Sequence, residues 1–285
     1  MTYQHINLEP MEGALGVEVI APALFADDKQ LQAAAVAEVY SAWLEYHLIV
    51  FRDLSLTPHE LARFCAQFGE LDTYPFVEAT TEHPNVIAIV KEPEQTKNFG
   101  GAWHTDTSYM AEPPKATCLL ALEVPERGGD TLFANTSKAY DALADNLRAK
   151  VNGLIGVFTP SLVHGTAGPY ADVKHGQQEK QSPELVVQRV QHPVIRTHPE
   201  TGRQAIYATP LHCERFESMS REESLPLLDQ LYEFATDARF STRLQWRPGT
   251  LAIWDNRCVF HNALNDYQGQ RREMLRVTLK GDVPA

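Results

Sequence analysis

The sequence predicts one domain with a mainly β fold, in which two packed sheets carry helices on their flank. Its 285 residues, 44% of them hydrophobic, suffice for one large core, and β-sandwich or barrel domains of this length often stay single. Short apolar segments at 86–90, 116–122 and 131–134 are separated by Gly and Pro. Such segments favour two β-sheets over an alternating βα arrangement. No repeat or change of composition marks a second domain, so we expect residues 1–285 to form one unit.

The first seventy residues predict a strand pair, a buried strand and two helices. The strand pair is expected within 5–20, and a helix over 28–46, where apolar residues recur at helical spacing. The apolar run 47–52 predicts a buried strand. A second helix should occupy 57–69, because Thr57 and the proline and glutamate that follow it match a helix N-cap with a capping box. These elements are interpreted as scaffold.

The remaining chain predicts two helices, a long loop and a buried strand. Helices are expected over 137–154 and 220–238. Residues 159–184 lose all periodicity, and a polar loop of this length in a compact domain is usually functional or disordered, so we interpret it as a mobile lid. The apolar run 251–263, rich in Trp, Ile, Val and Phe, predicts a largely buried strand that ends at His261.

Composition excludes several partners. The net charge is −12, from 25 basic and 37 acidic residues, and no basic run interrupts it, which argues against nucleic acid and acidic membrane surfaces. Four scattered cysteines without a C-x-x-C pair indicate reduced thiols. The N-terminus lacks the features of a signal peptide, and no apolar run approaches the length of a membrane span. We therefore expect a soluble, cytoplasmic protein.

The stretch F-G-G-A-W-H-T-D-T-S-Y at 99–109 predicts two ligands of a metal. In an extended segment, residues i and i+2 project to the same side, so His104 and Asp106 can point at one ion while Thr105 faces away. Two such ligands hold a metal weakly, so a third is expected from elsewhere in the chain.

The same spacing occurs twice more and does not identify a metal site by itself. His198 and Glu200 lie in T-H-P-E-T-G-R, where Pro and Gly mark a turn between two strand-like runs, so this pair is expected on a solvated hairpin surface. His212 and Glu214 have no flanking strand signal and are not expected to bind a metal.

The C-terminal region supplies the missing groups. His261 is the candidate third ligand, although a lone histidine in an apolar strand is more often a core residue. Arg272, Met274 and Arg276 share one face of a predicted strand. Two arginines beside a methionine indicate fixed cations that bind anions in a pocket by forked hydrogen bonds, and the alternative is an exposed strand face.

Two histidines and one carboxylate form the 2-His-1-carboxylate facial triad of non-haem Fe(II) sites. This set leaves three metal positions open, of which a 2-oxo acid can take two and O2 the third. An arginine farther away can then hold the second carboxylate of the co-substrate.

Further motifs accompany these residues in one order along the chain. They are W-H-T-D-T-S-Y at 103–109, P-P at 113–114, G-G-D-T-L-F at 128–133, H-P-V-I-R-T-H-P-E-T-G-R at 192–203, W-D-N-R at 254–257, H-N-A at 261–263 and R-R-E-M-L-R at 271–276. In these motifs, which span nearly the whole chain, the sequence resembles the Fe(II)/2-oxoglutarate-dependent dioxygenases of the taurine dioxygenase and 2,4-dichlorophenoxyacetate dioxygenase type.

The resemblance implies a fold, a reaction and roles for individual residues. The fold would be a distorted double-stranded β-helix, or jelly roll, assembled as a homodimer or homotetramer. Oxidative decarboxylation of 2-oxoglutarate to succinate and CO2 would drive hydroxylation of a small molecule by O2. The iron ligands would be His104, Asp106 and His261. Thr131 and Arg272 would bind the distal carboxylate of 2-oxoglutarate, and Arg276 an anionic group of the substrate.

Departures from the taurine enzymes bear on the substrate. Tyr74 replaces a histidine and Gly100 replaces an asparagine at two positions that contact the substrate in those enzymes. With Phe76 and Val77 nearby, a larger or more apolar acid is expected instead of taurine. Candidates are sulfonates, alkyl sulfates, aryloxyalkanoates and other carboxylates. Because Asp106 is retained, where related halogenases replace this carboxylate, hydroxylation is the expected chemistry.

Two rival interpretations remain. A zinc hydrolase could use the same three ligands, but no H-E-x-x-H arrangement supplies a base and Arg272 would have no role. A non-catalytic protein that binds a metal or a small acid would have no need of a complete triad with two arginines. Metal analysis and O2-dependent turnover distinguish the three.

Overall fold

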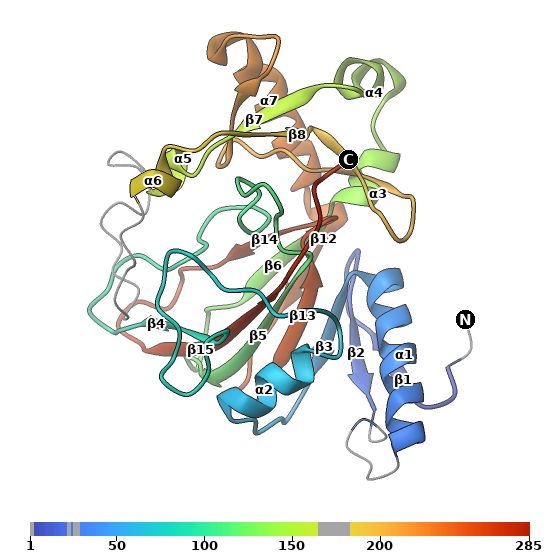
Figure 1. The fold of residues 1–285 in the computed structure, drawn as a ribbon, viewed down its shortest axis with the longest axis vertical. Helices are drawn as coiled ribbons and strands as arrows, with labels where there is room; N and C mark the ends of the chain where they lie inside the picture. The colour runs from blue at the N-terminus through green and yellow to red at the C-terminus, as the bar shows by residue number, and fades with distance from the viewer. Residues whose placement is uncertain (1–2, 22–23, 25–28, 165–182) are drawn as a thin grey trace.

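Figure 1 shows the fold in a computed structural model, which describes residues 3–21, 24, 29–164 and 183–285. Its largest sheet has seven strands in the order β1-β2-β3-β13-β5-β15-β4. These are β1 (Asn7–Pro10), β2 (Val17–Ile20), β3 (Leu48–Phe51), β4 (Ile87–Lys91), β5 (Ala116–Glu123), β13 (Leu251–Asp255) and β15 (Arg272–Leu279). Strands from both ends of the chain thus share one sheet.

Three smaller sheets and the helices complete the fold. The smaller sheets are β12-β6-β14, β11-β7-β8 and β10-β9, formed by β6 (Thr131–Asn135), β7 (Ile155–Phe158), β8 (Val190–Pro193), β9 (Ile195–Thr197), β10 (Gln204–Ile206), β11 (Cys213–Phe216), β12 (Ser241–Leu244) and β14 (Val259–Ala263). The helices are α1 (Lys29–Tyr46), α2 (Pro58–Cys65), α3 (Thr136–Asp141), α4 (Asp145–Val151), α5 (Ser161–His164), α6 (Pro183–Val186) and α7 (Arg221–Ala235). The mainly β jelly-roll fold expected from the sequence is confirmed.

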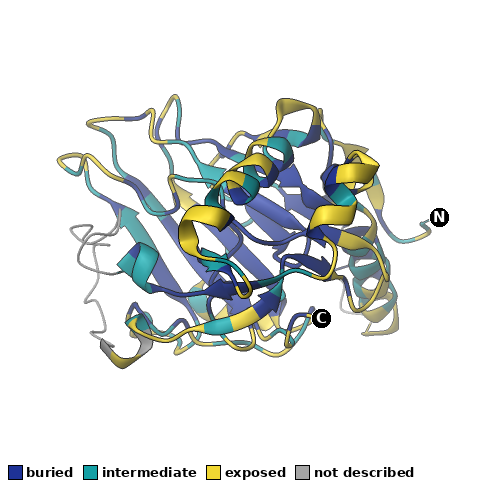
Figure 2. Cartoon of the chain, turned by 90° about the horizontal axis from the view of Figure 1, so that it is seen from above, coloured by how far each residue is buried: buried dark blue, intermediate teal, exposed yellow. Residues whose placement is uncertain are grey.

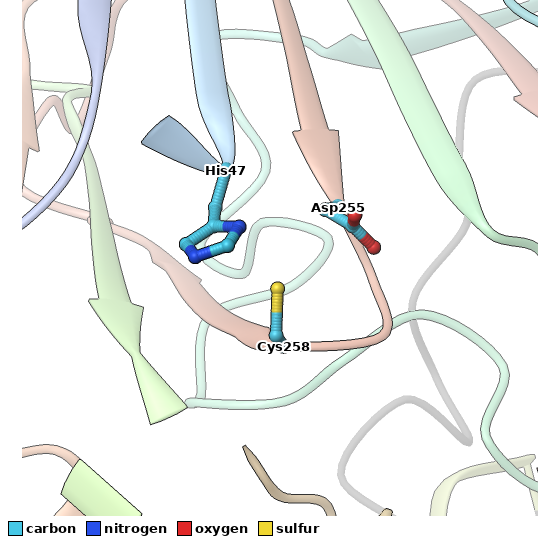
Figure 3. A group of neighbouring side chains, drawn as sticks. All are labelled: His47, Asp255 and Cys258. Carbon is cyan, nitrogen blue, oxygen red and sulfur yellow. The ribbon is translucent and has the colours of Figure 1, made fainter. Parts of the chain in front are cut away.

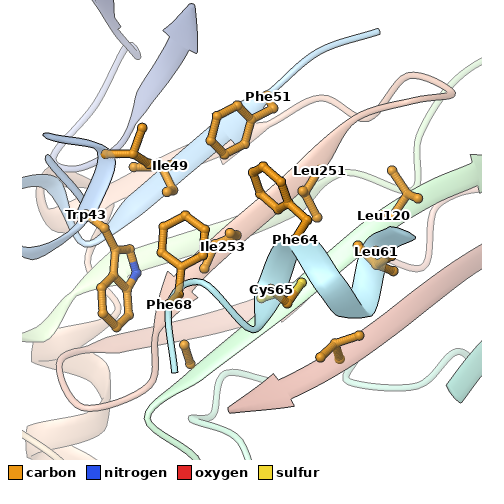
Figure 4. Close-up of a cluster of buried hydrophobic side chains, with 14 of the residues drawn as sticks. Trp43, Ile49, Phe51, Leu61, Phe64, Cys65, Phe68, Leu120, Leu251 and Ile253 are labelled. Atoms are coloured by element: carbon orange, nitrogen blue, oxygen red, sulfur yellow. The ribbon is translucent and has the colours of Figure 1, made fainter. Parts of the chain in front are cut away.

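The two faces of the seven-stranded sheet bury different cores, because alternate residues of a strand point to opposite sides. On one face, Ile49, Leu120 and Ile253 pack against α1 and α2 in the cluster of Figure 4. On the other face, Leu119 and Met274 join a second cluster with residues of β6, β12 and β14. Figure 2 shows the buried strands inside and the exposed outer sides of the helices. The site described below lies on this second face.

Local signals determine where two helices begin. Thr57 accepts a hydrogen bond from Glu60 N, and the Glu60 carboxylate accepts one from Thr57 N, so the predicted capping box of α2 is confirmed. Ser220 and Glu223 form the same reciprocal pair at the start of α7. Each satisfies backbone N–H groups that the first helical turn leaves without partners.

The helix expected over 137–154 is divided into α3 and α4. At the break, Arg148 Nη2 donates to the carbonyl oxygens of Tyr140, Asp141 and Leu143, at 3.4, 2.8 and 3.3 Å. One guanidinium thereby binds three carbonyl oxygens at and after the end of α3, so the interruption is stabilised by a contact across the break.

The run 251–263 is likewise not the single strand that its composition predicts. It forms β13 and β14 in two different sheets, joined by a turn at 256–258. The Asp255 carboxylate accepts hydrogen bonds from Arg257 N at 3.0 Å and Arg257 Nε at 2.8 Å, which stabilise this turn. His261 consequently lies in the middle of β14, on the second sheet.

The predicted lid at 159–184 falls mostly on residues 165–182, which lie outside the described residues, so it stays a prediction. His164 lies before them in α5, where its ring stacks on Phe76 with centroids 4.3 Å apart. No helix in the described ranges combines the length and the apolar character needed to cross a membrane.

Candidate active site

A backbone bridge brings the two predicted histidine ligands together. His104 N donates to His261 O at 3.0 Å, and His261 N donates to His104 O at 2.7 Å. Their imidazole centroids are 4.2 Å apart. His104 belongs to this isolated bridge and is followed by a turn, instead of ending a strand as expected. Thr105 faces away as predicted, and its hydroxyl donates to Asn256 O.

Asp106 completes a buried three-residue cluster. Its Oδ1 lies 3.6 Å from His104 Nε2 and 3.8 Å from His261 Nε2, and the three ligand atoms lie within 4.8 Å of one another. His104 Nδ1 donates to Ala102 O at 2.7 Å, which leaves the Nε2 lone pair free. Two imidazole nitrogens and a carboxylate oxygen face the same small space. This donor set fits a divalent transition metal such as iron or zinc.

A chain of hydrogen bonds fixes the Asp106 carboxylate. Trp254 Nε1 donates to Asn256 Oδ1 at 2.9 Å, Asn256 Nδ2 donates to Thr117 Oγ1 at 3.0 Å, and Thr117 Oγ1 donates to Asp106 Oδ2 at 2.5 Å. Asp106 Oδ2 is thereby held, and Oδ1 remains free toward the histidines. Outer partners of this kind orient a metal ligand and tune its affinity.

The electrostatics of the cluster favour a bound cation. Burial by itself would raise the pKa of Asp106, but Arg276 and the two histidines hold it well below the usual range, so the carboxylate is ionised. Burial, with His104 close by, lowers the pKa of His261 to about 3, so its imidazole is neutral. Ionised carboxylate and neutral imidazole are the protonation states that bind metals.

Figure 3 shows a second group of potential ligands, His47, Asp255 and Cys258, in which the carboxylate is already occupied. Each carboxylate oxygen of Asp255 already accepts two hydrogen bonds. Oδ1 accepts from Arg257 N and Nε, and Oδ2 accepts from Arg257 Nη2 and His198 Nε2. These bonds occupy the lone pairs that a metal would need. Although His47 has neither ring nitrogen bonded within the described part of the chain, the group does not fit a metal as arranged.

His198 is buried, which corrects its predicted position on a solvated hairpin. The hairpin itself forms between β9 and β10. His198 is only 1% exposed, and both of its ring nitrogens are hydrogen-bonded. Nε2 donates to Asp255 at 2.9 Å, and Nδ1 accepts from Glu200 N and Thr201 N, both at 3.2 Å. The histidine thus ties the turn of the hairpin to the β13–β14 corner.

Arg272 and Thr131 line the same cavity as His104, Asp106 and His261. Thr131 Oγ1 accepts from Trp246 Nε1 at 2.9 Å, so its own O–H remains available to a ligand. Arg272 is 7% exposed, and its Nε and Nη2 have no hydrogen-bond partner among the residues described. Its guanidinium lies 5.7 Å from the Trp246 ring centroid. A buried guanidinium with unused donors fits a bound carboxylate.

Arg276 also lines the cavity and lies beside Asp106. Its Nη2 lies 3.1 Å from Asp106 Oδ2, an ion-pair distance, although the atoms are not aligned for a hydrogen bond. The guanidinium also lies 4.9 Å from the Tyr74 ring centroid and 6.0 Å from that of Phe99. Aromatic rings and a metal ligand therefore hold this cation in place.

The structure gathers the predicted site residues. The cavity is lined by His104, Asp106, Thr131, His261, Arg272 and Arg276, while Tyr74 reaches it through Arg276. The sequence did not indicate a role for Thr117, Trp246 or His212. The buried His212 ring has its centroid 5.8 Å from that of His104 and is hydrogen-bonded to Ser108. Thr117 is the one polar residue inside the apolar run 116–122, and this pattern could have indicated a functional role.

Comparisons with known proteins agree with this geometry. Residues 7–278 match the family model described as "Taurine catabolism dioxygenase TauD, TfdA family". The α-ketoglutarate-dependent sulfate ester dioxygenase of Pseudomonas putida is 30% identical, covering 98% of this chain and 91% of that protein. The (S)-phenoxypropionate/α-ketoglutarate-dioxygenase of Sphingobium herbicidovorans is 30% identical, covering 97% and 95%. The crystal structure of a taurine dioxygenase from Burkholderia xenovorans is 32% identical, with a TM-score of 0.80, covering 99% and 93%.

Proposed function

Because this chain belongs to the TauD, TfdA family of dioxygenases, we propose that it couples decarboxylation of 2-oxoglutarate (α-ketoglutarate) to hydroxylation of a small organic anion. The observation that carries the proposal is the buried cluster in which two histidine Nε2 atoms lie 3.6 and 3.8 Å from one oxygen of Asp106. A buried arginine with unused donors lines the same cavity.

His104, Asp106 and His261 would hold Fe(II) in this proposal. When bound there, Fe(II) with 2-oxoglutarate and O2 would supply the oxidation that yields succinate, CO2 and a hydroxylated product. The protein's own contribution is to prepare the ligands. Ala102 O selects the His104 tautomer, and Thr117 holds the outer oxygen of Asp106, so both groups are oriented before a metal arrives.

Arg272 and Thr131 would bind the distal carboxylate of 2-oxoglutarate. A guanidinium offers a carboxylate two parallel N–H donors, and the threonine hydroxyl can donate a third hydrogen bond. Burial strengthens such bonds because water does not compete for them. Trp246 contacts both residues and fixes their relative positions.

Arg276 would bind an anionic group of the substrate, with Tyr74 beside it. Sulfate esters and phenoxypropionate, the substrates in the names of two relatives, are anions of this kind. Tyr74 and Phe76 are buried here with ring centroids 5.8 Å apart. Aromatic rings next to Arg276 support an anion with a longer or aromatic body, such as an alkyl sulfate, sulfonate or aryloxyalkanoate, over a compact aminosulfonate.

The two rival functions have less support. A zinc hydrolase needs a general base beside the metal, and the described residues around the cluster offer the ligands, aromatic rings and arginines but no additional carboxylate. The hydrolase also gives Arg272 no role, and a purely binding function does not explain a complete triad in a member of a dioxygenase family.

We further propose a cytoplasmic protein with one domain and a homo-oligomeric assembly, a dimer or tetramer by family resemblance. One sheet contains both β1 and β15, which supports a single domain over 1–285. The cysteines, all buried and unpaired, suit a reducing compartment. The net charge of −12 supports the absence of nucleic-acid partners. Light scattering after size-exclusion chromatography measures the assembly.

The test is anaerobic spectroscopy followed by a substrate screen. Protein with Fe(II) and 2-oxoglutarate should develop a visible charge-transfer band, and His104→Ala or His261→Ala should remove it. With O2, a panel of sulfonates, sulfates, aryloxy acids and amino acids is screened for compounds that increase succinate formation. If both variants keep the band and still produce succinate, the ligand assignment is wrong. If all the hits are neutral compounds, the substrate proposal is wrong.

A further inference from the structure

Lys91 is a buried cation that lies opposite Arg272 and forms no ion pair within the described residues. Its side chain is 5% exposed, and Nζ has no hydrogen-bond partner in the described parts of the chain. The ammonium lies over the Tyr267 ring, whose centroid is 4.4 Å away. Lysine is rarely buried without a partner, because removing its charge from water costs several kcal/mol. We therefore expect an anionic ligand beside this ammonium.

The register of the sheet places Lys91 beside Arg272. β4 pairs with β15 so that Lys91 lies directly opposite Arg272, and Ile89 opposite Met274. Directly opposed residues of an antiparallel pair point to the same face, with Cβ atoms about 5 Å apart. Ile89 and Arg272 both line the cavity, so Lys91, two residues from Ile89, shares the cavity face.

Tyr267 connects Lys91 with the G-G-D-T turn that carries Thr131. A Cβ atom on Gly129 would lie 3.3 Å from the Tyr267 ring, so the glycine permits the turn to pack against this ring. Lys91 thus contacts Tyr267 and lies opposite Arg272, which lines the cavity together with Thr131 and the three candidate metal ligands.

Among the described residues, no carboxylate is hydrogen-bonded to Lys91 Nζ or to Arg272 Nε and Nη2. Asp130 acts electrostatically on Arg272, but its Oδ2 already binds Arg243 Nε at 2.6 Å. Burial lowers the pKa of Lys91 and also that of Arg272, which means that both cations are held at a cost in free energy. An anion placed between two such cations relieves their desolvation and their mutual repulsion.

We propose that Lys91 is a second cation for the distal carboxylate of the 2-oxo acid, acting beside Arg272 and Thr131, with Tyr267 holding its ammonium in place. The inference rests on the proposed function. It adds that selectivity for a co-substrate with two carboxylates depends on a pair of cations, one from each of two neighbouring strands. The competing explanation is that Lys91 only supports the Tyr267 ring.

Isothermal titration with two ligands distinguishes these explanations. The enzyme is loaded with Mn(II) in place of Fe(II), so that binding is measured without turnover. 2-Oxoglutarate is compared with 2-oxopentanoate, which has the same chain length and lacks the distal carboxylate. Lys91→Met should weaken 2-oxoglutarate by about tenfold or more, because it removes a charged partner, and should leave 2-oxopentanoate binding unchanged. Lys91→Arg should retain most of the 2-oxoglutarate affinity.

Lys115→Met is the matched control. Lys115 is half-buried and also lies over aromatic rings, with Nζ 5.3 Å from the Tyr40 centroid and 5.9 Å from that of Trp43, but these rings belong to α1. This variant should bind both ligands as the wild type does. Circular dichroism and thermal unfolding verify that each variant folds, and Lys91→Gln replaces Lys91→Met if the latter does not.

Each outcome decides the inference. Equal weakening of both ligands by the Lys91 variant identifies a structural role and overturns the proposal, and so does unchanged binding of 2-oxoglutarate. An Arg272→Met variant is titrated in parallel as the reference. If wild-type protein binds no 2-oxoglutarate, or if the Arg272 variant binds it normally, the proposed function fails instead, and the two failures are distinguishable.

Discussion

Replacing Thr117 by valine tests whether the hydrogen-bond chain behind Asp106 prepares the metal site. Thr117 is fully buried in β5, donates to Asp106 Oδ2 at 2.5 Å and accepts from Asn256 Nδ2 at 3.0 Å. Valine has nearly the same shape, so the substitution removes the hydroxyl with little change in packing. It separates the contribution of these two hydrogen bonds from that of the side-chain volume.

The expected magnitude follows from what each partner loses. Asp106 loses a charge-assisted bond and Asn256 is left with a buried donor unpaired, each worth about 1–3 kcal/mol. Because the two losses share one hydroxyl and are not additive, we expect the free energy of unfolding to fall by about 2–4 kcal/mol. Asp106 keeps its contact with Arg276 at 3.1 Å but can rotate. Metal affinity should fall by about 10–100-fold, as for other lost outer partners of metal ligands.

Urea unfolding measures the stability and an anaerobic Mn(II) or Fe(II) titration measures the affinity. Thr136→Val is the control, because Thr136 is equally buried but its hydroxyl has no hydrogen-bond partner among the described residues. That variant should be close to neutral in stability and in metal affinity. The reasoning is refuted if Thr117→Val binds metal as tightly as the wild type, or if Thr136→Val loses as much affinity.

Three further changes have defined outcomes. Arg272→Ala should raise the 2-oxoglutarate requirement by well over tenfold, since losing a partly buried charged partner costs about 2–5 kcal/mol, and an unchanged requirement would move this role elsewhere. Arg276→Ala should reduce turnover of the best anionic substrate but leave 2-oxoglutarate binding intact; equal turnover contradicts the assignment. Burial lowers the pKa of His47 to about 4, so the unfolded chain binds a proton that the folded one excludes, and stability falls as pH decreases from 6.5 to 4. Asparagine suits the φ of 62° at this position, so His47→Asn is the test variant. Between pH 6.5 and 4 its free energy of unfolding, measured with urea at each pH, should fall by about 3 kcal/mol less than that of the wild type. Equal decreases in the two proteins would contradict the reasoning.

Much of the scaffold could be predicted because its signals are local. The capping box of α2 needs only Thr57 and Glu60, and the alternation of Arg272, Met274 and Arg276 follows from the two-residue period of a strand. The family motifs identified the dioxygenase class, which the comparisons support over 7–278. Local sequence also placed Thr105 away from its two neighbours.

The sequence by itself determined which side chains were available for chemistry, and only the tertiary structure decided which of them meet. His198 and His104 share the same His-x-acid spacing, yet His198 bonds a structural aspartate while His104 faces His261 across a bridge. The turn after Asp255 and the pairing of Lys91 with Arg272 depend on contacts between distant segments. Such contacts leave no periodic trace in the chain, because their energy comes from partners that are remote in sequence and become neighbours only when the sheets pack.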